Sequence, residues 1–169
     1  MTRGRFLGPL LARFAVCGVL LLSAGAGWAA VSNDYRHGVA CNPATPSTAL
    51  HYDQYGVRNE STTTSAVVLC DLGNMNLDSS MTAMAFYVRV WDAASSSKIA
   101  CNFVVTESNG NTTWTSNTLY STSSDGSAAE TLSVVANVIK GYAHLRCILP
   151  PKDAQTGASY ISSVQRVSF

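Results

Sequence analysis

The chain has 169 residues and carries 11 lysines and arginines against 10 aspartates and glutamates, which fits one modest domain and excludes a multi-domain assembly. Three of the arginines lie within the first 13 residues, so residues 30–169 carry eight basic against ten acidic side chains, a net charge of −2. That sign argues against nucleic acid as a partner, because proteins that bind nucleic acid are usually basic.

The first 29 residues predict a secretory signal peptide. Three arginines form its basic start, residues 14–26 are apolar, and small residues precede a cleavage point after Ala29. The apolar run is shorter than the ~20 residues that a membrane-spanning helix needs, so a retained membrane anchor is the less favoured alternative. We expect a mature chain of residues 30–169 that is secreted or periplasmic and has no membrane span.

The cysteines indicate disulfides. Cys17 lies inside the apolar run and would be removed with the signal peptide, which leaves Cys41, Cys70, Cys101 and Cys147. An even number of cysteines in an exported chain predicts two disulfides. The rival interpretation is a four-cysteine zinc site, but such sites usually contain Cys-x₂-Cys pairs and this chain has none. We expect neither a metal nor another cofactor.

The composition favours strands and turns. Serine and threonine make up 34 of the 140 residues from 30 to 169, so the polar side chains of this region are mainly hydroxyls rather than charged groups. In chain order we expect strands at 37–42, 54–59 and 64–70, and then a strictly alternating strand at 83–91. On that strand the inward residues are Met84, Phe86, Val88 and Val90, and the outward residues are Tyr87, Arg89 and Trp91.

Two further alternating strands each place a cysteine on the apolar side. At 99–105 the apolar side contains Cys101, and at 142–149 it contains Cys147. Two inward cysteines near strand centres can meet in the core, so we expect the pair Cys101–Cys147, which leaves Cys41–Cys70.

Residues 127–141 admit two interpretations. Ser127 and Glu130 form a capping-box pattern that predicts a short helix, whereas Leu132 and Val134 would both point inward in a strand. We favour a strand at 131–135. With a weaker strand at 114–120 and a last one at 159–169, the chain is expected to form one all-β domain. Its fold would be an antiparallel β-sandwich of Greek-key or jelly-roll type, with about seven or eight short strands.

Five segments together resemble a known group of proteins. They are CNP at 41–43, YGVRN at 55–59, AVVLC at 66–70, KIAC at 98–101 and GYAHLRCILP at 141–150. This pattern is similar to that of small exported proteins of uncharacterised function from Gram-negative bacteria, which usually place proline after the second cysteine, where this chain has Asp71. The resemblance implies an exported β domain and transfers no functional residue.

The outward row Tyr87, Arg89 and Trp91 is the main candidate site. Its side chains would stand about 7 Å apart, so the rings could stack on successive sugars while the arginine donates hydrogen bonds. If the strand with Tyr142, His144 and Arg146 lies in the same sheet, the two rows would merge into one platform. The alternative is that these residues are ordinary cross-strand pairs that shield the backbone.

Weaker candidates lie elsewhere in the chain. Trp114 and Tyr120 could form a second contact at a loop tip or fold over the edge of the core. Oxygen-bearing side chains at alternating positions in 71–78 suit a calcium loop, but the segment lacks the glycine placement and the terminal glutamate of an EF-hand, so an ordinary turn rich in Asp and Asn is favoured. His51 and Asp53 could share a strand face as an acid–base pair, although no nucleophile motif accompanies them.

These observations favour a non-catalytic binding module over an enzyme. We expect recognition of a glycan or surface polymer by the row at 87–91. The alternative is a protein-interaction module, such as an inhibitor or a surface-assembly component, that uses a sheet edge or a loop tip. A hydrolase is the third class considered.

Overall fold

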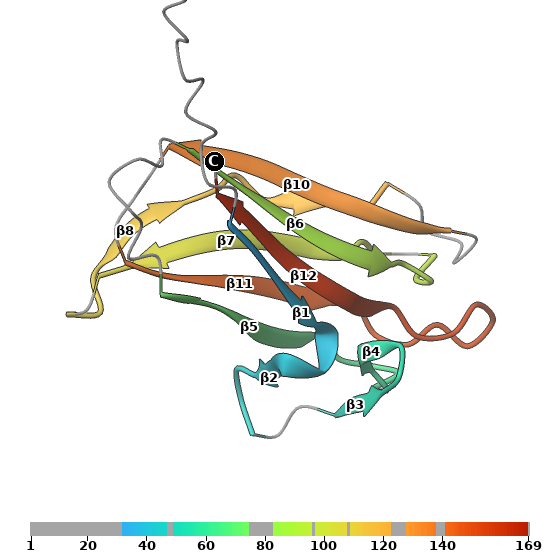
Figure 1. Cartoon of the computed structure of the whole chain (residues 1–169). Helices are drawn as coiled ribbons and strands as arrows, with labels where there is room; N and C mark the ends of the chain where they lie inside the picture. Colours follow the sequence, from blue (N-terminus) through green and yellow to red (C-terminus); the bar gives the residue numbers. More distant parts are fainter. Residues whose placement is uncertain are drawn as a thin grey trace, which may run out of the picture.

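The computed structural model describes residues 32–46, 49–74, 83–95, 97–107, 109–122, 128–137 and 141–168. These residues form two six-stranded antiparallel sheets that pack face to face (Figure 1). The predicted fold class, an all-β antiparallel sandwich, is confirmed. The predicted signal peptide and its cleavage point lie outside the described residues. No helix within the described ranges is long and apolar enough to cross a membrane.

The first sheet carries the predicted outward row. Its strand order is β10 (Ala129–Asn137), β6 (Ala83–Trp91), β12 (Tyr160–Ser168), β4 (Gly56–Asn59) and β3 (Leu50–Asp53). A sixth strand, β1 (Ser32–His37), also pairs with β12, on the side away from β6. The strand β6 therefore lies between β10 and β12, and both of its neighbours contribute side chains to its outward surface.

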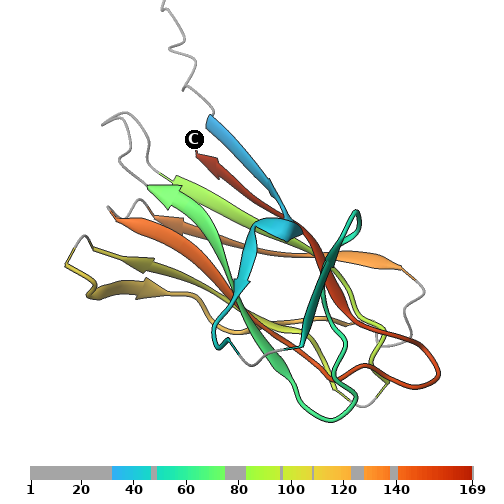
Figure 2. The same cartoon turned by 90° about the horizontal axis from the view of Figure 1, so that it is seen from below.

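The second sheet carries all four cysteines of the predicted disulfides. Its order is β2 (Cys41–Pro43), β5 (Ala66–Asn74), β11 (Tyr142–Leu149), β7 (Ala100–Thr106) and β8 (Thr112–Thr115), and β9 (Leu119–Tyr120) pairs with β7 beside β8. Figure 2 shows the two layers seen from below. Seven of the twelve described strands have six or more residues, and the others are short.

The core between the sheets follows from alternation along the strands. The four inward side chains of β6 are completely buried, and the bounds of this strand are those predicted. On the facing sheet, Phe103 stacks against Phe86 with ring centroids 5.1 Å apart. Burying such side chains contributes about 1.5 to 3 kcal/mol each, so this contact is one of those that hold the two layers together.

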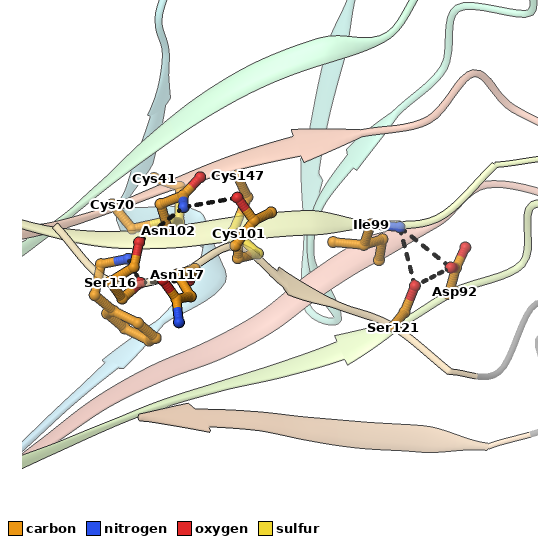
Figure 3. The surroundings of a disulfide bond; sticks show 12 residues. Cys41, Cys70, Asp92, Ile99, Cys101, Asn102, Ser116, Asn117, Ser121 and Cys147 are labelled. Carbon is orange, nitrogen blue, oxygen red and sulfur yellow. Dashed lines mark hydrogen bonds between the residues drawn. A yellow bond between two sulfur atoms is a disulfide. The ribbon is translucent and has the colours of Figure 1, made fainter. Parts of the chain in front are cut away.

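Both disulfides join neighbouring strands of the second sheet. Cys41 lies directly opposite Cys70 on β2 and β5, and Cys101 lies opposite Cys147 on β7 and β11. The predicted pairing is therefore confirmed, and all four side chains are buried. Figure 3 shows the surroundings of Cys101 and Cys147. The first sheet contains neither of these two bonds.

The predicted single strand at 37–42 is wrong. The chain leaves the first sheet at the end of β1, makes a 3₁₀ turn at Gly38–Ala40, and enters the second sheet as β2. A side chain at position 38 would collide with the carbonyl oxygen of Ile161 on β12. Glycine allows the crossing backbone to lie against β12, and an alternation pattern carries no sign of such a change of sheet.

Other predicted bounds shift by several residues. The strand expected at 54–59 starts at Gly56, because Gln54 and Tyr55 form the turn between β3 and β4. The strand expected at 64–70 runs from Ala66 to Asn74, and the one expected at 114–120 is broken into β8 and β9. The strand interpretation of 131–135 is confirmed by β10, in which Leu132 is buried and Val135 is exposed, against the helical pattern.

A buried carboxylate joins three chain segments at one end of the sandwich. Asp92 is completely buried just after β6. It accepts hydrogen bonds from the hydroxyls of Ser121 and Ser159 and from the backbone amides of Ala94 and Ile99. Figure 3 shows Asp92, Ser121 and Ile99 together. These four donors offset the cost of burying the carboxylate and fix where the chain leaves β6.

We predict that removing the disulfide between Cys101 and Cys147, as a double serine variant, lowers the free energy of unfolding by about 4 kcal/mol, because the cross-link restricts the unfolded chain. Urea unfolding followed by fluorescence measures this change. The matched control is the double serine variant at Cys41 and Cys70, whose shorter loop predicts a slightly smaller loss. An unchanged unfolding midpoint in both variants would contradict a structural role for these bonds.

We predict that Asp92→Ala lowers the free energy of unfolding by about 3 kcal/mol. The buried hydroxyls of Ser121 and Ser159 would lose their acceptor, and the amides of Ala94 and Ile99 would keep only their bonds to these two hydroxyls. Thermal unfolding of the two proteins measures the effect. Asp71→Ala serves as the control, since exposed Asp71 accepts one local bond from the amide of Gly73. A loss no greater than that of the control would show that Asp92 does not hold these segments.

Candidate functional site

Strand pairing gathers four aromatic side chains on the outer surface of the first sheet. On β6, Trp91 lies opposite Tyr160 of β12. Four positions earlier, Tyr87 lies opposite Gln165 of β12, which in turn lies opposite Tyr35 of β1. Arg89 stands between these two aromatic rows. We call this surface the aromatic face and define it by Tyr35, Tyr87, Arg89, Trp91 and Tyr160.

The rings of the aromatic face are accessible to solvent. Tyr35 is 62% exposed, and Tyr87, Trp91 and Tyr160 are partly exposed. The rings of Trp91 and Tyr160 are nearly parallel, with an interplanar angle of 7° and centroids 5.9 Å apart. Trp91 and Tyr160 therefore form a cross-strand pair, as the alternative interpretation of this row expects. The pairing still leaves ring surface open to a ligand.

The turn between β3 and β4 adds a further aromatic ring. Tyr55 is 58% exposed, and its backbone amide donates a hydrogen bond of 2.8 Å to Oδ1 of Asp53. The next residue, Gly56, has φ +133°, and a side chain there would collide with the carbonyl of Ile161. Glycine therefore lets the turn approach β12, and this approach places Tyr55 at the edge of the aromatic face.

Two hollows lie side by side on the aromatic face. The larger has a volume of about 280 Å³ and is lined by Tyr35, His37, Gln54, Tyr55, Arg89, Trp91, Ala129, Tyr160 and Ser162. The smaller has a volume of about 180 Å³ and is lined by Tyr35, Tyr87, Arg89, Thr131, Ser163 and Gln165. Arg89 and Tyr35 line both, so the two hollows adjoin at these side chains, and we call them together the groove.

At one end of the groove, the charged side chains are paired with one another. The guanidinium of Arg58 lies 3.0 Å from a carboxylate oxygen of Asp53 and 2.6 Å from one of Glu60, which also pairs with Lys152 at 2.7 Å. The hydrogen bond from Lys152 is the main reason that the pKa of Glu60 is lowered. Glu60 therefore stays charged at neutral pH, and both Asp53 and Glu60 are already engaged in ion pairs.

The hydroxyl of Tyr160 is kept protonated beside this ion-pair network. Burial raises its pKa above the ordinary value, and the charge of Asp53 raises it further, while Arg89 acts in the opposite direction. A protonated phenol can donate a hydrogen bond to a ligand oxygen. The groove therefore offers a hydroxyl donor at one end and a guanidinium at its centre.

The predicted merging of two outward rows is wrong. Tyr142, His144 and Arg146 lie on β11 of the second sheet, so they face the opposite side of the sandwich. Sequence alternation shows which side chains share a strand face but not which sheet a strand joins. The partners that the structure supplies instead, Tyr35 and Tyr160, come from β1 and β12.

The weaker candidates are resolved in part. Trp114 folds over the edge of the core, where its ring stacks with Phe86 at 6.2 Å, whereas Tyr120 is exposed. Asp71 lies in β5 and accepts a hydrogen bond from the amide of Gly73, and residues 75–78 of the proposed calcium loop lie outside the described residues.

The acid–base candidate is present as a loose pair. Nε2 of His51 lies 3.9 Å from Oδ2 of Asp53, and the same carboxylate oxygen is held by Arg58. Within the described part of the chain, no hydroxyl or thiol is hydrogen-bonded to His51. The arrangement does not form the nucleophile–base pair that covalent hydrolysis needs.

No family model and no curated protein matches the sequence. Among solved structures, the chain is similar to a family 35 carbohydrate binding module from Clostridium thermocellum, with 14% identity over 80% of this chain and 97% of that one and a TM-score of 0.48. It is also similar to the family 35 module of Abf62 from Cellvibrio japonicus, with 9% identity, 80% and 92% coverage and a TM-score of 0.49. A third similar structure is a xylan-binding module of family 15, with 13% identity, 83% and 97% coverage and a TM-score of 0.46. Likeness at this level transfers no ligand to this chain.

We predict that the stability of the second sheet depends on the protonation of His144. Burial lowers the pKa of His144, although Asp71 opposite it acts the other way, so the folded state takes up a proton less readily than the unfolded chain. The stabilising contribution is present above the ordinary histidine pKa of about 6.5 and is lost as pH falls below it.

Urea unfolding of wild type and His144→Gln at about pH 8 and about pH 5.5 measures this effect. We expect wild type to lose more stability on acidification than the variant does. The control is His51→Gln, at an exposed position. Equal losses in wild type and His144→Gln would contradict the prediction.

Proposed function

We propose that this protein is a secreted or periplasmic, non-catalytic module that binds a glycan in the groove of the aromatic face. The observation that carries the proposal is the convergence of Tyr35, Tyr87, Trp91 and Tyr160, from three strands, around two adjoining hollows. Binding sites usually combine apolar and aromatic surface with a few oriented polar groups, and this groove has that composition.

The chemistry of the groove suits a sugar chain. Partly exposed rings offer apolar surface to the C–H faces of pyranoses, and the hydroxyls of Ser162 and Thr131 can exchange hydrogen bonds with sugar hydroxyls. The two aromatic rows are four residues apart on β6, a distance of about 13 Å along a strand. An oligosaccharide can contact both rows, whereas a single sugar ring reaches one.

The disulfides support an extracytoplasmic location. Buried bonds between Cys41 and Cys70 and between Cys101 and Cys147 form and persist in an oxidising compartment. Glycans of cell envelopes and of plant matter are encountered in that compartment. The proposed location and the proposed ligand are therefore consistent with each other.

A protein partner is the second candidate, and it rests on the free edge of β10. Among the described residues this nine-residue strand pairs with β6 alone, and Val135 is 64% exposed on it. An unpaired edge can accept a strand from another chain. Retention of a stoichiometric protein partner after enzymatic removal of glycans, with no glycan bound in parallel assays, would favour this alternative.

We predict that Trp91→Ala weakens binding to the polysaccharide that the wild type retains by about tenfold or more, because a ring contact worth roughly 1.4 kcal/mol is lost. A glycan array followed by affinity electrophoresis in polysaccharide gels identifies the ligand and measures the change. Tyr142→Ala is the matched control, since it removes an exposed ring from the opposite sheet. Absence of any glycan binding, or equal weakening by the control, would refute the proposal.

A further inference from the structure

The guanidinium of Arg89, at the centre of the groove, has no partner among the residues that the structure describes. Arg89 is exposed, and its side chain makes no ion pair or hydrogen bond with any described residue. Its cross-strand neighbours are Thr131 on β10 and Ser163 on β12, neither of which carries charge. By contrast, Arg58 pairs with two acids near the same groove.

The acids around the aromatic face are engaged elsewhere. Asp53 and Glu60 hold Arg58, and Glu60 also holds Lys152. Glu130 lies opposite inward-facing Val90, and its carboxylate accepts hydrogen bonds from Thr122. None of these carboxylates is hydrogen-bonded or ion-paired to Arg89, so negative charge for its guanidinium has to come from outside the described part of the protein.

A ligand in the groove would cover this guanidinium. Arg89 lines both hollows and stands between the two aromatic rows, so a sugar chain that touches both rows passes over it. Removing a charge from water is costly unless an opposite charge compensates it. A neutral glycan supplies only hydroxyl oxygens, whereas a carboxylate supplies two oxygens that match the planar fork of the guanidinium.

We propose that the ligand is an acidic glycan whose uronic-acid carboxylate pairs with Arg89. This inference rests on the proposed glycan-binding function and specifies its substrate class. The rings then provide contact with the sugar faces, and Arg89 selects the charged residue of the chain. Tyr160, whose hydroxyl remains protonated, adds a neutral donor beside the same position.

The test compares acidic polysaccharides with their own carboxyl-reduced forms, in which each uronic acid has become a neutral sugar. Polygalacturonate, glucuronoxylan and alginate are the probes, and binding is measured by affinity electrophoresis and calorimetry. We expect wild type to bind at least one acidic probe about tenfold or more tighter than its reduced form, and Arg89→Gln to lose this preference while it still binds the reduced form. Arg146→Gln is the matched control, because it removes an exposed charge from the opposite sheet.

The possible results separate the inference from the proposed function. Equal or tighter binding of reduced or other neutral glycans would overturn the carboxylate assignment and leave glycan binding intact. Preference for a sulfated polysaccharide over the carboxylated probes would also overturn it, as would an equal loss of preference in Arg146→Gln. If wild type binds no glycan of any kind, the proposed function fails and the inference fails with it. Thermal unfolding of each variant checks that the fold is retained.

Discussion

The burial of one side of β6 between the sheets is the constraint on which the rest of the structure depends. Its four inward side chains are completely buried, and Phe86 among them stacks on Phe103 of the second sheet. A shift of one residue would bury the outward arginine and expose this apolar set, so the register is strongly fixed. The same constraint points Tyr87, Arg89 and Trp91 away from the core, and the candidate site is thus the outer side of the strand that anchors the core.

The alternation of apolar and polar residues correctly predicted the features that depend on one strand alone. The alternation at 83–91 and 142–149 indicated which side chains point inward, and with it the pairing of Cys101 and Cys147. Pairing between distant strands leaves no such sign. The change of sheet at Gly38 depends on close contact with the backbone of Ile161, 123 positions later in the chain, and a lone glycine has many other uses.

The candidate site also combines residues predicted from one strand with residues that only the pairing of distant strands brings together. Three of its residues, on β6, were predicted from their alternation, whereas Tyr35 and Tyr160 join them only because β1 and β12 pair at that register. The row on β11 had an equally persuasive pattern and lies on the opposite face. A pattern therefore finds outward aromatic and charged residues, but the pairing order of the sheet decides which of them share a ligand. The buried Asp92 escaped prediction because its four donors come from segments scattered along the chain.

The pairing of β1 with β12 also determines where the two ends of the described chain lie relative to the groove. Ser32 lies opposite Ser168, so both terminal strands reach the same rim of the sandwich, whereas Tyr160 and Trp91 stand at the other rim, about 25 Å away along β12. A tag, a dye or a surface attached through either end of the described chain would lie far from the larger hollow. Immobilisation through these ends consequently leaves the Trp91 and Tyr160 end of the larger hollow accessible from the solution, whichever end is used.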